Sequence, residues 1–216
     1  MTITSPVTRE ASTYAAAAST GLFTLAYLVL GPFRPGYSQI ADQISDLGVG
    51  RLAPVMNATF ILSGLLLFGA ASAIARGVRP AVGTSARWIA VLLAIPAIGQ
   101  ILCGIFTEAR PTQGPHVLGA MMGFAIPVLA FPITGLILRR SPAYRRIGNR
   151  LLTSGPLALI ILVIFFNTGA PEAVGKHLGI GGLTERIMVL HVQFWYIAIS
   201  AAVLRGPHSV GYQLRR

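Results

Sequence analysis

The sequence predicts an all-α fold, a polytopic membrane helical bundle of six transmembrane helices that forms a single integral membrane domain over residues 1–216. Three observations support this prediction: the composition, the lengths of the apolar segments and the distribution of charge. Of the 216 residues, 54% are hydrophobic and 11% are charged, whereas a soluble domain usually carries about 25% charged residues. We therefore expect a membrane protein without a separate soluble domain.

The apolar residues gather in six segments, each long enough for one crossing. A spanning helix needs roughly 20 mostly apolar residues, and helices satisfy their own backbone groups in lipid. Glu10 interrupts the lead before the first run, which favours a retained helix over a cleaved signal peptide. Prolines 96, 127, 132 and 156 fall inside the spans, where they are expected to kink the helices. The predicted spans are residues 12–31, 54–75, 88–106, 117–138, 151–167 and 184–204.

The charged residues predict the orientation of the spans. With the N-terminus inside, the inner segments hold twelve cations and one acid, and the outer segments hold five of each. This asymmetry follows the positive-inside rule, so both termini are expected inside. The inner residues are Arg9, Glu10, Arg76, Arg79, Arg87, Arg139, Arg140, Arg145, Arg146, Arg150, Arg205, Arg215 and Arg216. The outer residues are Arg34, Asp42, Asp46, Arg51, Glu108, Arg110, Glu172, Lys176, Glu185 and Arg186.

The stretch "SQIADQISDLG", residues 38–48, connects the first two spans. Ile40, Ile44 and Leu47 follow the i, i+4, i+7 spacing of a helix face, which predicts a short amphipathic outer helix. Asp46 would then lie in its last turn, where the helix dipole disfavours a negative charge. A compensating cation or hydrogen-bond donor is expected, with Arg51, Arg110, Arg186 and a protonated histidine as the candidate partners; alternatively, both aspartates of the stretch simply solvate the loop.

The strongly polar side chains within the spans lie toward the outer side. They are Asn57, Gln100, Asn167, His191 and Gln193, and the inner halves hold serine and threonine instead. A polar group without a partner is costly in lipid, so such groups usually converge or line a wet cavity. The asymmetry therefore predicts a polar pocket that opens to the outer face.

Five outer residues are the candidate catalytic residues: Asp46, Glu108, His116, Glu185 and His191. Carboxylates and imidazoles serve as general acids and bases, and they also bind Zn²⁺ or other metals. Structural roles remain open beside these: Glu185 suits a helix N-terminus, and His191 could be hydrogen-bonded to a neighbour. The motifs HExxH and GxSxG and the Walker loop are absent, so the sequence identifies no cofactor and leaves metal binding undecided.

Three stretches resemble the prokaryotic membrane family called domain of unknown function 998. They are "YSQIADQISDLGVG", "GIFTEARPTQGPHVLGAMMGF" and "GLTERIMVLHVQFWY". The resemblance covers nearly the whole chain after the first span, and ISDLG is its most specific part. The resemblance implies six helices, with the three stretches at these positions between and within them. It implies no established activity. Thr107 stands where that family often has proline.

Three functions follow as hypotheses. The first is a multi-pass protein of the prokaryotic plasma or inner membrane whose carboxylate and histidine pocket acts on or binds an amphipathic, lipid-like molecule. The second is a small-molecule transporter or channel subunit, possible as an oligomer. The third is a non-catalytic assembly partner that uses the small residues Gly64, Gly69 and Ala73 for helix packing. The lipid bilayer is the expected partner, with anionic headgroups at the inner arginines, and nucleic acid is not expected.

Overall fold

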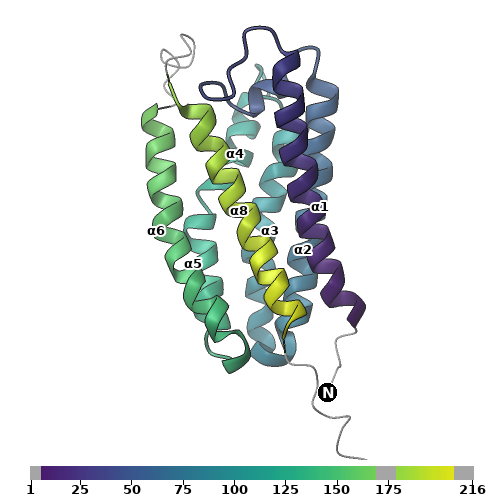
Figure 1. The fold of residues 1–216 in the computed structure, drawn as a ribbon, viewed down its shortest axis with the longest axis vertical. Helices are drawn as coiled ribbons and strands as arrows, with labels where there is room; N and C mark the ends of the chain where they lie inside the picture. Colours follow the sequence, from purple (N-terminus) through teal and green to yellow (C-terminus); the bar gives the residue numbers. More distant parts are fainter. Residues whose placement is uncertain (1–5, 169–178, 207–216) are drawn as a thin grey trace, which may run out of the picture.

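The computed structural model describes residues 6–168 and 179–206, with side chains from residue 10 onward. Regular structure in these ranges is helical throughout, as predicted (Figure 1). The α-helices are α1 (Pro6–Leu30), α2 (Ala53–Val82), α3 (Ala86–Ile105), α4 (Gln113–Phe124), α5 (Pro127–Leu138), α6 (Arg145–Thr168) and α8 (Gly181–Leu204). Short 3-10 turns are η1 (Gly31–Phe33), η2 (Ser45–Gly48), η3 (Gly83–Ser85) and η4 (Pro142–Tyr144).

Five helical segments of the described chain are long and apolar enough to cross a membrane. They are Glu10–Phe33, Ala53–Ile105, Gln113–Leu138, Pro142–Thr168 and Gly181–Leu204. The second is 53 residues long and contains both α2 and α3, which pack against each other after the turn at η3. Gly83 in that turn has φ +60°, a conformation that favours glycine. The number of crossings predicted from the sequence stays a prediction.

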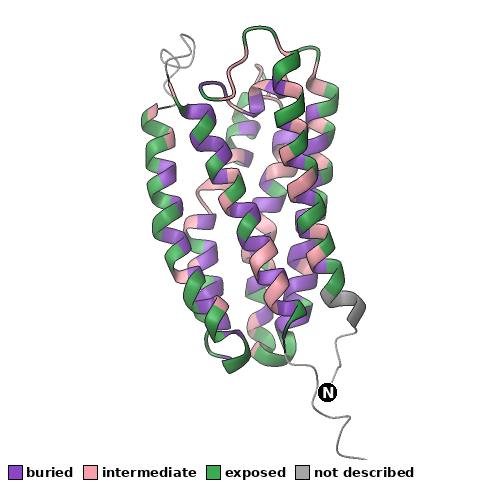
Figure 2. Cartoon of the chain, viewed as in Figure 1, coloured by how far each residue is buried: buried purple, intermediate pink, exposed green. Residues whose placement is uncertain are grey.

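Outward-facing side chains are apolar along the middle of the helices. Leu25, Leu65, Leu129, Ile160 and Phe194 are all more than half exposed. Figure 2 shows exposed and buried residues alternating along each helix, so each helix presents one side to its neighbours and one outward. Helices that are apolar on both sides are typical of membrane spans, because lipid replaces water around the bundle.

A break at Ala125 and Ile126 divides the fourth predicted span into α4 and α5. Proline has no N–H, so Pro127 leaves a carbonyl of the preceding turn without its helical donor. The Ile126 N–H reaches back to the Met121 carbonyl at 3.4 Å, and Val128 bonds to Ala125 at 3.2 Å. The helical hydrogen-bond pattern is therefore interrupted before Pro127, where a proline kink was expected.

Two pairs of glycines bring neighbouring helices into backbone contact. A Cβ added at Gly119 of α4 would lie 2.7 Å from the Gly99 carbonyl oxygen of α3. A Cβ added at Gly99 would likewise collide with the Gly119 carbonyl oxygen. Between α5 and α6, a Cβ at Gly135 would lie 2.6 Å from the Gly148 oxygen. Small residues permit such close approach in membrane bundles.

The small-residue face suggested for α2 is only partly used. A Cβ at Gly64 would lie 2.9 Å from the Ala97 oxygen, so Gly64 packs on α3, and Ala73 is buried. Gly69 instead points outward with no atom within 4 Å of the position of its missing Cβ.

The predicted amphipathic helix over residues 38–48 is wrong. Only Ser45–Gly48 is helical, and it is a 3-10 turn of four residues. Ile44 and Leu47 are fully buried beside Phe23 and Met56, while Ile40 is exposed. The i, i+4, i+7 spacing thus places two apolar side chains in the core without forming a continuous helix.

Candidate functional site

The two aspartates of the loop stabilise its turns. Asp42 Oδ2 accepts the backbone N–H of Ser38 at 2.7 Å, and Asp46 Oδ2 accepts that of Gln43 at 2.8 Å. Aspartate commonly bonds nearby backbone in this way at turns. The hydrogen-bond donor expected for Asp46 is therefore the Gln43 backbone amide, and not one of the cationic side chains named from the sequence. Arg34 lies close by and donates to the Asp46 backbone carbonyl.

The same loop completes the N-terminus of α8. The first N–H groups of a helix have no partner inside the helix. Gly182 N–H donates to the Ala41 carbonyl at 3.1 Å, and Leu183 N–H donates to the Ile40 carbonyl at 2.8 Å. Gly182 is needed for this approach, because an added Cβ would collide with the Asp42 carbonyl. The loop is thereby held against a helix that begins about 140 residues later in the chain.

Arg186 secures this contact from inside the bundle. It is 7% exposed. Its guanidinium donates to the Asp42 carbonyl at 3.0 Å, to the Gln39 side-chain oxygen at 3.0 Å and to the Tyr37 hydroxyl. The group also lies 5.4 Å from the Tyr27 ring centroid and 5.7 Å from that of Tyr37, within cation–π range. Hydrogen bonds and aromatic faces therefore compensate for the burial of this charge.

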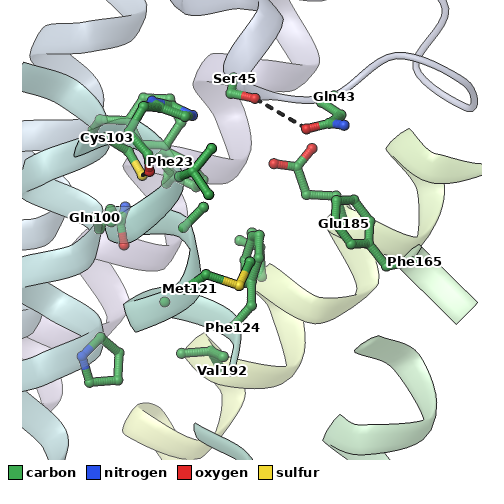
Figure 3. A pocket seen from close by; sticks show the side chains of 18 of the residues that line it. Phe23, Gln43, Ser45, Gln100, Cys103, Met121, Phe124, Phe165, Glu185 and Val192 are labelled. Atoms are coloured by element: carbon green, nitrogen blue, oxygen red, sulfur yellow. Dashed lines mark hydrogen bonds between the residues drawn. The ribbon is translucent and has the colours of Figure 1, made fainter. Parts of the chain in front are cut away.

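Glu185, the preceding residue, joins the loop to a cavity. Its Oε2 accepts the Ile44 N–H at 2.6 Å, and the residue is 5% exposed. Figure 3 shows its carboxylate directed toward Gln43 and Ser45 of the loop. Glu185 thus contacts the loop and lines the cavity below it.

The cavity has a volume of about 280 Å³ and lies among α1, α2, α3, α4, α6 and α8 beneath the loop. Its polar lining comprises Gln43, Ser45, Gln100, Cys103, Glu108, His116, Glu185 and Gln193. Most of the remaining wall is apolar and includes five phenylalanines, Phe23, Phe60, Phe124, Phe165 and Phe166. Apolar walls with a few polar groups are typical of ligand sites for small molecules.

Several polar atoms in this wall lack a partner among the described residues. They are Gln100 Nε2, Glu108 Oε2 and both side-chain polar atoms of Gln193. Gln193 is 1% exposed, so bulk water does not reach it freely. A buried polar atom left unpaired costs about 1–3 kcal/mol, and native structures rarely leave one so without a reason. Three side chains with unpartnered polar atoms therefore surround one cavity.

The structure brings three of the five predicted candidates to this cavity: Glu108, His116 and Glu185. Asp46 is not part of the lining, although it lies near Glu108. His191 faces α6 instead, where its Nε2 lies 3.0 Å from the Ser154 hydroxyl. Positions two apart on a helix point about 200° apart, so Gln193 faces the cavity while His191 does not.

His116 and Glu185 each bond to backbone and not to each other. His116 Nδ1 lies 2.8 Å from the Phe106 carbonyl oxygen, which indicates that this nitrogen carries the proton. Among the described residues no group of three His, Cys, Asp or Glu side chains stands close enough to hold a metal ion. His116 and Glu185 therefore do not form a direct acid–base pair in this structure.

Burial shifts the ionisation of two loop residues. It raises the pKa of Asp46 to about 6, and the neighbouring Glu108 adds to the rise, while the Gln43 N–H opposes it. Burial likewise raises the pKa of the Tyr37 phenol to about 12 against the effect of Arg186. Asp46 therefore titrates in a mildly acidic range.

The stability of the protein is expected to fall as pH rises from about 4 to 6, in part because of Asp46. In this window the folded state binds the Asp46 proton more tightly than the unfolded chain does, so deprotonation favours unfolding. The contribution is about 1 kcal/mol, because partial exposure screens the charge. Asp46→Asn keeps an acceptor for the Gln43 N–H but does not titrate. Thermal unfolding in detergent at several pH values should show a shallower pH dependence in Asp46→Asn, and identical slopes would contradict the assignment.

Sequence reasoning identified the polar groups at Gln100 and Gln193 but not the aromatic wall or the residues around Arg186. Glu185, Val189, Val192 and Gln193 follow i, i+4, i+7 and i+8 spacing on α8, and all four line the cavity. That spacing separates Gln193 from His191 and was available in the sequence. No comparable spacing in the sequence indicates the roles of Tyr27 and Tyr37, because their partner Arg186 lies far away in the chain. The predicted outer residues Glu172 and Lys176 lie outside the described residues.

A family model described as "Protein of unknown function (DUF998)" matches residues 17–202, which is most of the chain. No curated protein and no solved structure matches the chain.

Proposed function

The chain belongs to the DUF998 family, whose function is unknown, and from its own geometry we propose that it is a multi-pass protein of the cell membrane that binds an amphipathic molecule in the cavity beneath the 38–48 loop. The observation that carries the proposal is the set of unpartnered polar atoms on Gln100, Glu108 and Gln193 around one largely apolar cavity. Apolar walls suit a hydrocarbon chain, and the unpartnered atoms suit a polar headgroup.

Six crossings with both termini inside fit this proposal. The 53-residue segment from Ala53 would measure about 80 Å as one straight helix, against a hydrocarbon core of about 30 Å. Its two antiparallel halves, α2 and α3, therefore count as separate crossings. Nine arginines of the proposed inner side are exposed near the helix ends and turns: Arg76, Arg79, Arg87, Arg139, Arg140, Arg145, Arg146, Arg150 and Arg205. The N-terminal end of α1, the α5–α6 turn and the end of α8 share one end of the bundle (Figure 1), and the positive-inside rule supports placing that end in the cytoplasm.

Binding is favoured over a continuous pore. Below the cavity, toward the arginine-rich end, a core of buried apolar side chains fills the bundle and includes Ile74, Ile89, Leu93, Phe131 and Ile199. Close-packed apolar side chains leave few spaces larger than a water molecule. A ligand that reaches the cavity therefore meets closely packed apolar side chains of the described helices beyond it.

Filling the cavity is expected to remove the bound molecule. Gly123 of α4 lines the cavity, and an added Cβ there meets no atom within 4 Å. The Gly123→Leu side chain would extend into the free space and lower occupancy about tenfold, equivalent to about 1.4 kcal/mol of binding energy. The protein is extracted from membranes in native lipid particles with a styrene–maleic acid copolymer, and the retained amphiphiles are measured by mass spectrometry.

The matched control is Gly69→Leu, because Gly69 is also a helical glycine with open space at its Cβ but lies away from the cavity. Wild type and Gly69→Leu should retain the same amphiphile, and Gly123→Leu should be depleted of it. If all three proteins carry the same amphiphiles in the same amounts, the cavity is not the binding site and the proposal is wrong.

A further inference from the structure

The unpartnered atoms of the cavity include both donors and acceptors, and this mixture restricts the headgroup. Gln100 Nε2 and Gln193 Nε2 are donors, while Glu108 Oε2 and Gln193 Oε1 are acceptors. A carboxylate or phosphate offers acceptors and no donor, and an ammonium offers donors and no acceptor. A hydroxyl group donates and accepts, so a headgroup with several hydroxyls satisfies both kinds of atom at once.

The charges of the lining also disfavour an anionic headgroup. Glu108 and Glu185 contribute carboxyl groups, while none of the described lining residues is a lysine or arginine. His116 also lines the cavity, and its Nδ1 bonds to the Phe106 carbonyl. Arg186, next to Glu185, is engaged with Tyr37, Gln39 and the Asp42 carbonyl. Among the described residues, an anion here would be desolvated without a lysine or arginine to pair with, which is strongly unfavourable.

The lateral wall of the cavity lies between α4 and α6. α4 packs mainly on α3, and α6 packs on α5 and α8, so α4 and α6 are not extensively packed against each other in the described chain. Phe124 of α4 and Phe165 of α6 meet edge to face with ring centroids 6.1 Å apart. Val117 and Phe166 line the cavity and are 48% and 57% exposed, so the cavity extends to the outward surface here.

We propose, resting on the function proposed above, that the ligand is an uncharged single-chain amphiphile with a hydroxylated headgroup, and that its acyl chain lies between α4 and α6. The headgroup bonds to Gln100, Glu108 and Gln193, and the chain leaves past the Phe124–Phe165 pair toward the bilayer. The volume of about 280 Å³ is at the lower end for ligand pockets, which span about 300–1,000 Å³. It holds a headgroup and the first part of one chain, and the rest of the chain lies in lipid.

The test uses the full chain in phosphatidylcholine nanodiscs with a monoacylglycerol that carries a photoreactive diazirine in its acyl chain. After illumination, mass spectrometry of peptides locates the attachment. Attachment is expected on α4 and α6 near Phe124 and Phe165. Unlabelled monoacylglycerol should compete at concentrations about tenfold lower than the fatty acid or the primary amine of the same chain length, since each of these leaves at least one buried group unpaired.

Gln193→Met tests the headgroup contact, because it removes both amide atoms while keeping a side chain of similar length. Labelling by the monoacylglycerol should fall about tenfold, and competition by the fatty acid should change little. The control is Asn167→Met, at an exposed amide near the end of α6 that does not line the cavity. The competition series in the wild-type protein does not depend on how either variant folds.

The outcomes separate this inference from the proposed function. If the fatty acid or the amine competes as well as the monoacylglycerol, the headgroup assignment is wrong. If labelling is specific but falls on helices other than α4 and α6, the position of the chain is wrong. In either case, depletion of a retained amphiphile in Gly123→Leu would still support a cavity ligand. If the labelling is not specific and Gly123→Leu also keeps its amphiphile, the proposed function is wrong as well.

Discussion

Arg186→Lys is expected to lower the free energy of unfolding by about 3 kcal/mol. Lysine keeps the charge but cannot reproduce the separate hydrogen bonds of the guanidinium to Tyr37, Gln39 and the Asp42 carbonyl. Each hydrogen bond to a charged group is worth about 1.5–3 kcal/mol, and the buried ammonium would retain only some of them. Lysine also lacks the guanidinium that lies 5.4 Å from the Tyr27 ring centroid.

The effect should appear locally before the whole bundle unfolds. Hydrogen–deuterium exchange in Arg186→Lys should speed up at the amides of residues 41–47, because the loop loses its anchor on α8. Arg51→Lys is the control, since Arg51 is exposed at the end of the same connection, and surface changes of this kind are usually within about 0.5 kcal/mol. Unchanged loop exchange and an unchanged melting temperature in Arg186→Lys would show that Arg186 does not anchor the loop.

Gly99→Val is expected to cost about 3 kcal/mol and to reduce the yield of monodisperse protein. The new Cβ would collide with the Gly119 carbonyl and lie 2.7 Å from the Met122 Cβ, and 2.9 Å from the Gly123 nitrogen. Backbone atoms cannot rotate away as a flexible side chain does, so α3 and α4 must separate, and overpacking of this kind costs about 1–3 kcal/mol or more.

Gly69→Val makes the same chemical change in a helix where the new Cβ meets nothing within 4 Å. Gly69→Val therefore measures the effect of the changed helix propensity alone. The difference in stability between the two variants then gives the effect of the contact between α3 and α4. Thermal unfolding in detergent, followed by size-exclusion chromatography, measures both. Equal stability of the two variants would mean that α3 and α4 tolerate a wider separation than the structure shows.

The helical segments could be predicted because their cause is local. Each requires a run of apolar residues of bilayer length, and this length is visible in the chain itself. The interruption between α4 and α5 also has a local cause in Pro127. For these features a short stretch of sequence contains all the necessary information.

The loop and the glycine contacts could not be predicted in the same way. Residues 38–48 have helical spacing, but the loop is stabilised by Glu185 and Gly182, whose contacts are invisible in a short window. Gly99 and Gly119 lie 20 positions apart in the numbering, and each resembles the other glycines of the spans. Among the candidates, Glu108, His116 and Glu185 line the cavity, as expected if outer polar groups converge, whereas His191 lies on another face of α8.

The hydrogen bonds from Gly182 and Leu183 to the loop carbonyls have a consequence for biosynthesis. A ribosome delivers residues 38–48 before α8, so the loop has no contact with α8 while the intervening helices are made. A chain truncated after α6 lacks Arg186 and Glu185, and it leaves Tyr37, Gln39 and the Ile44 amide without their contacts to α8. The site beneath the loop is thus completed only after α8 has been made, and a chain that stops before α8 differs at this surface from one that includes it.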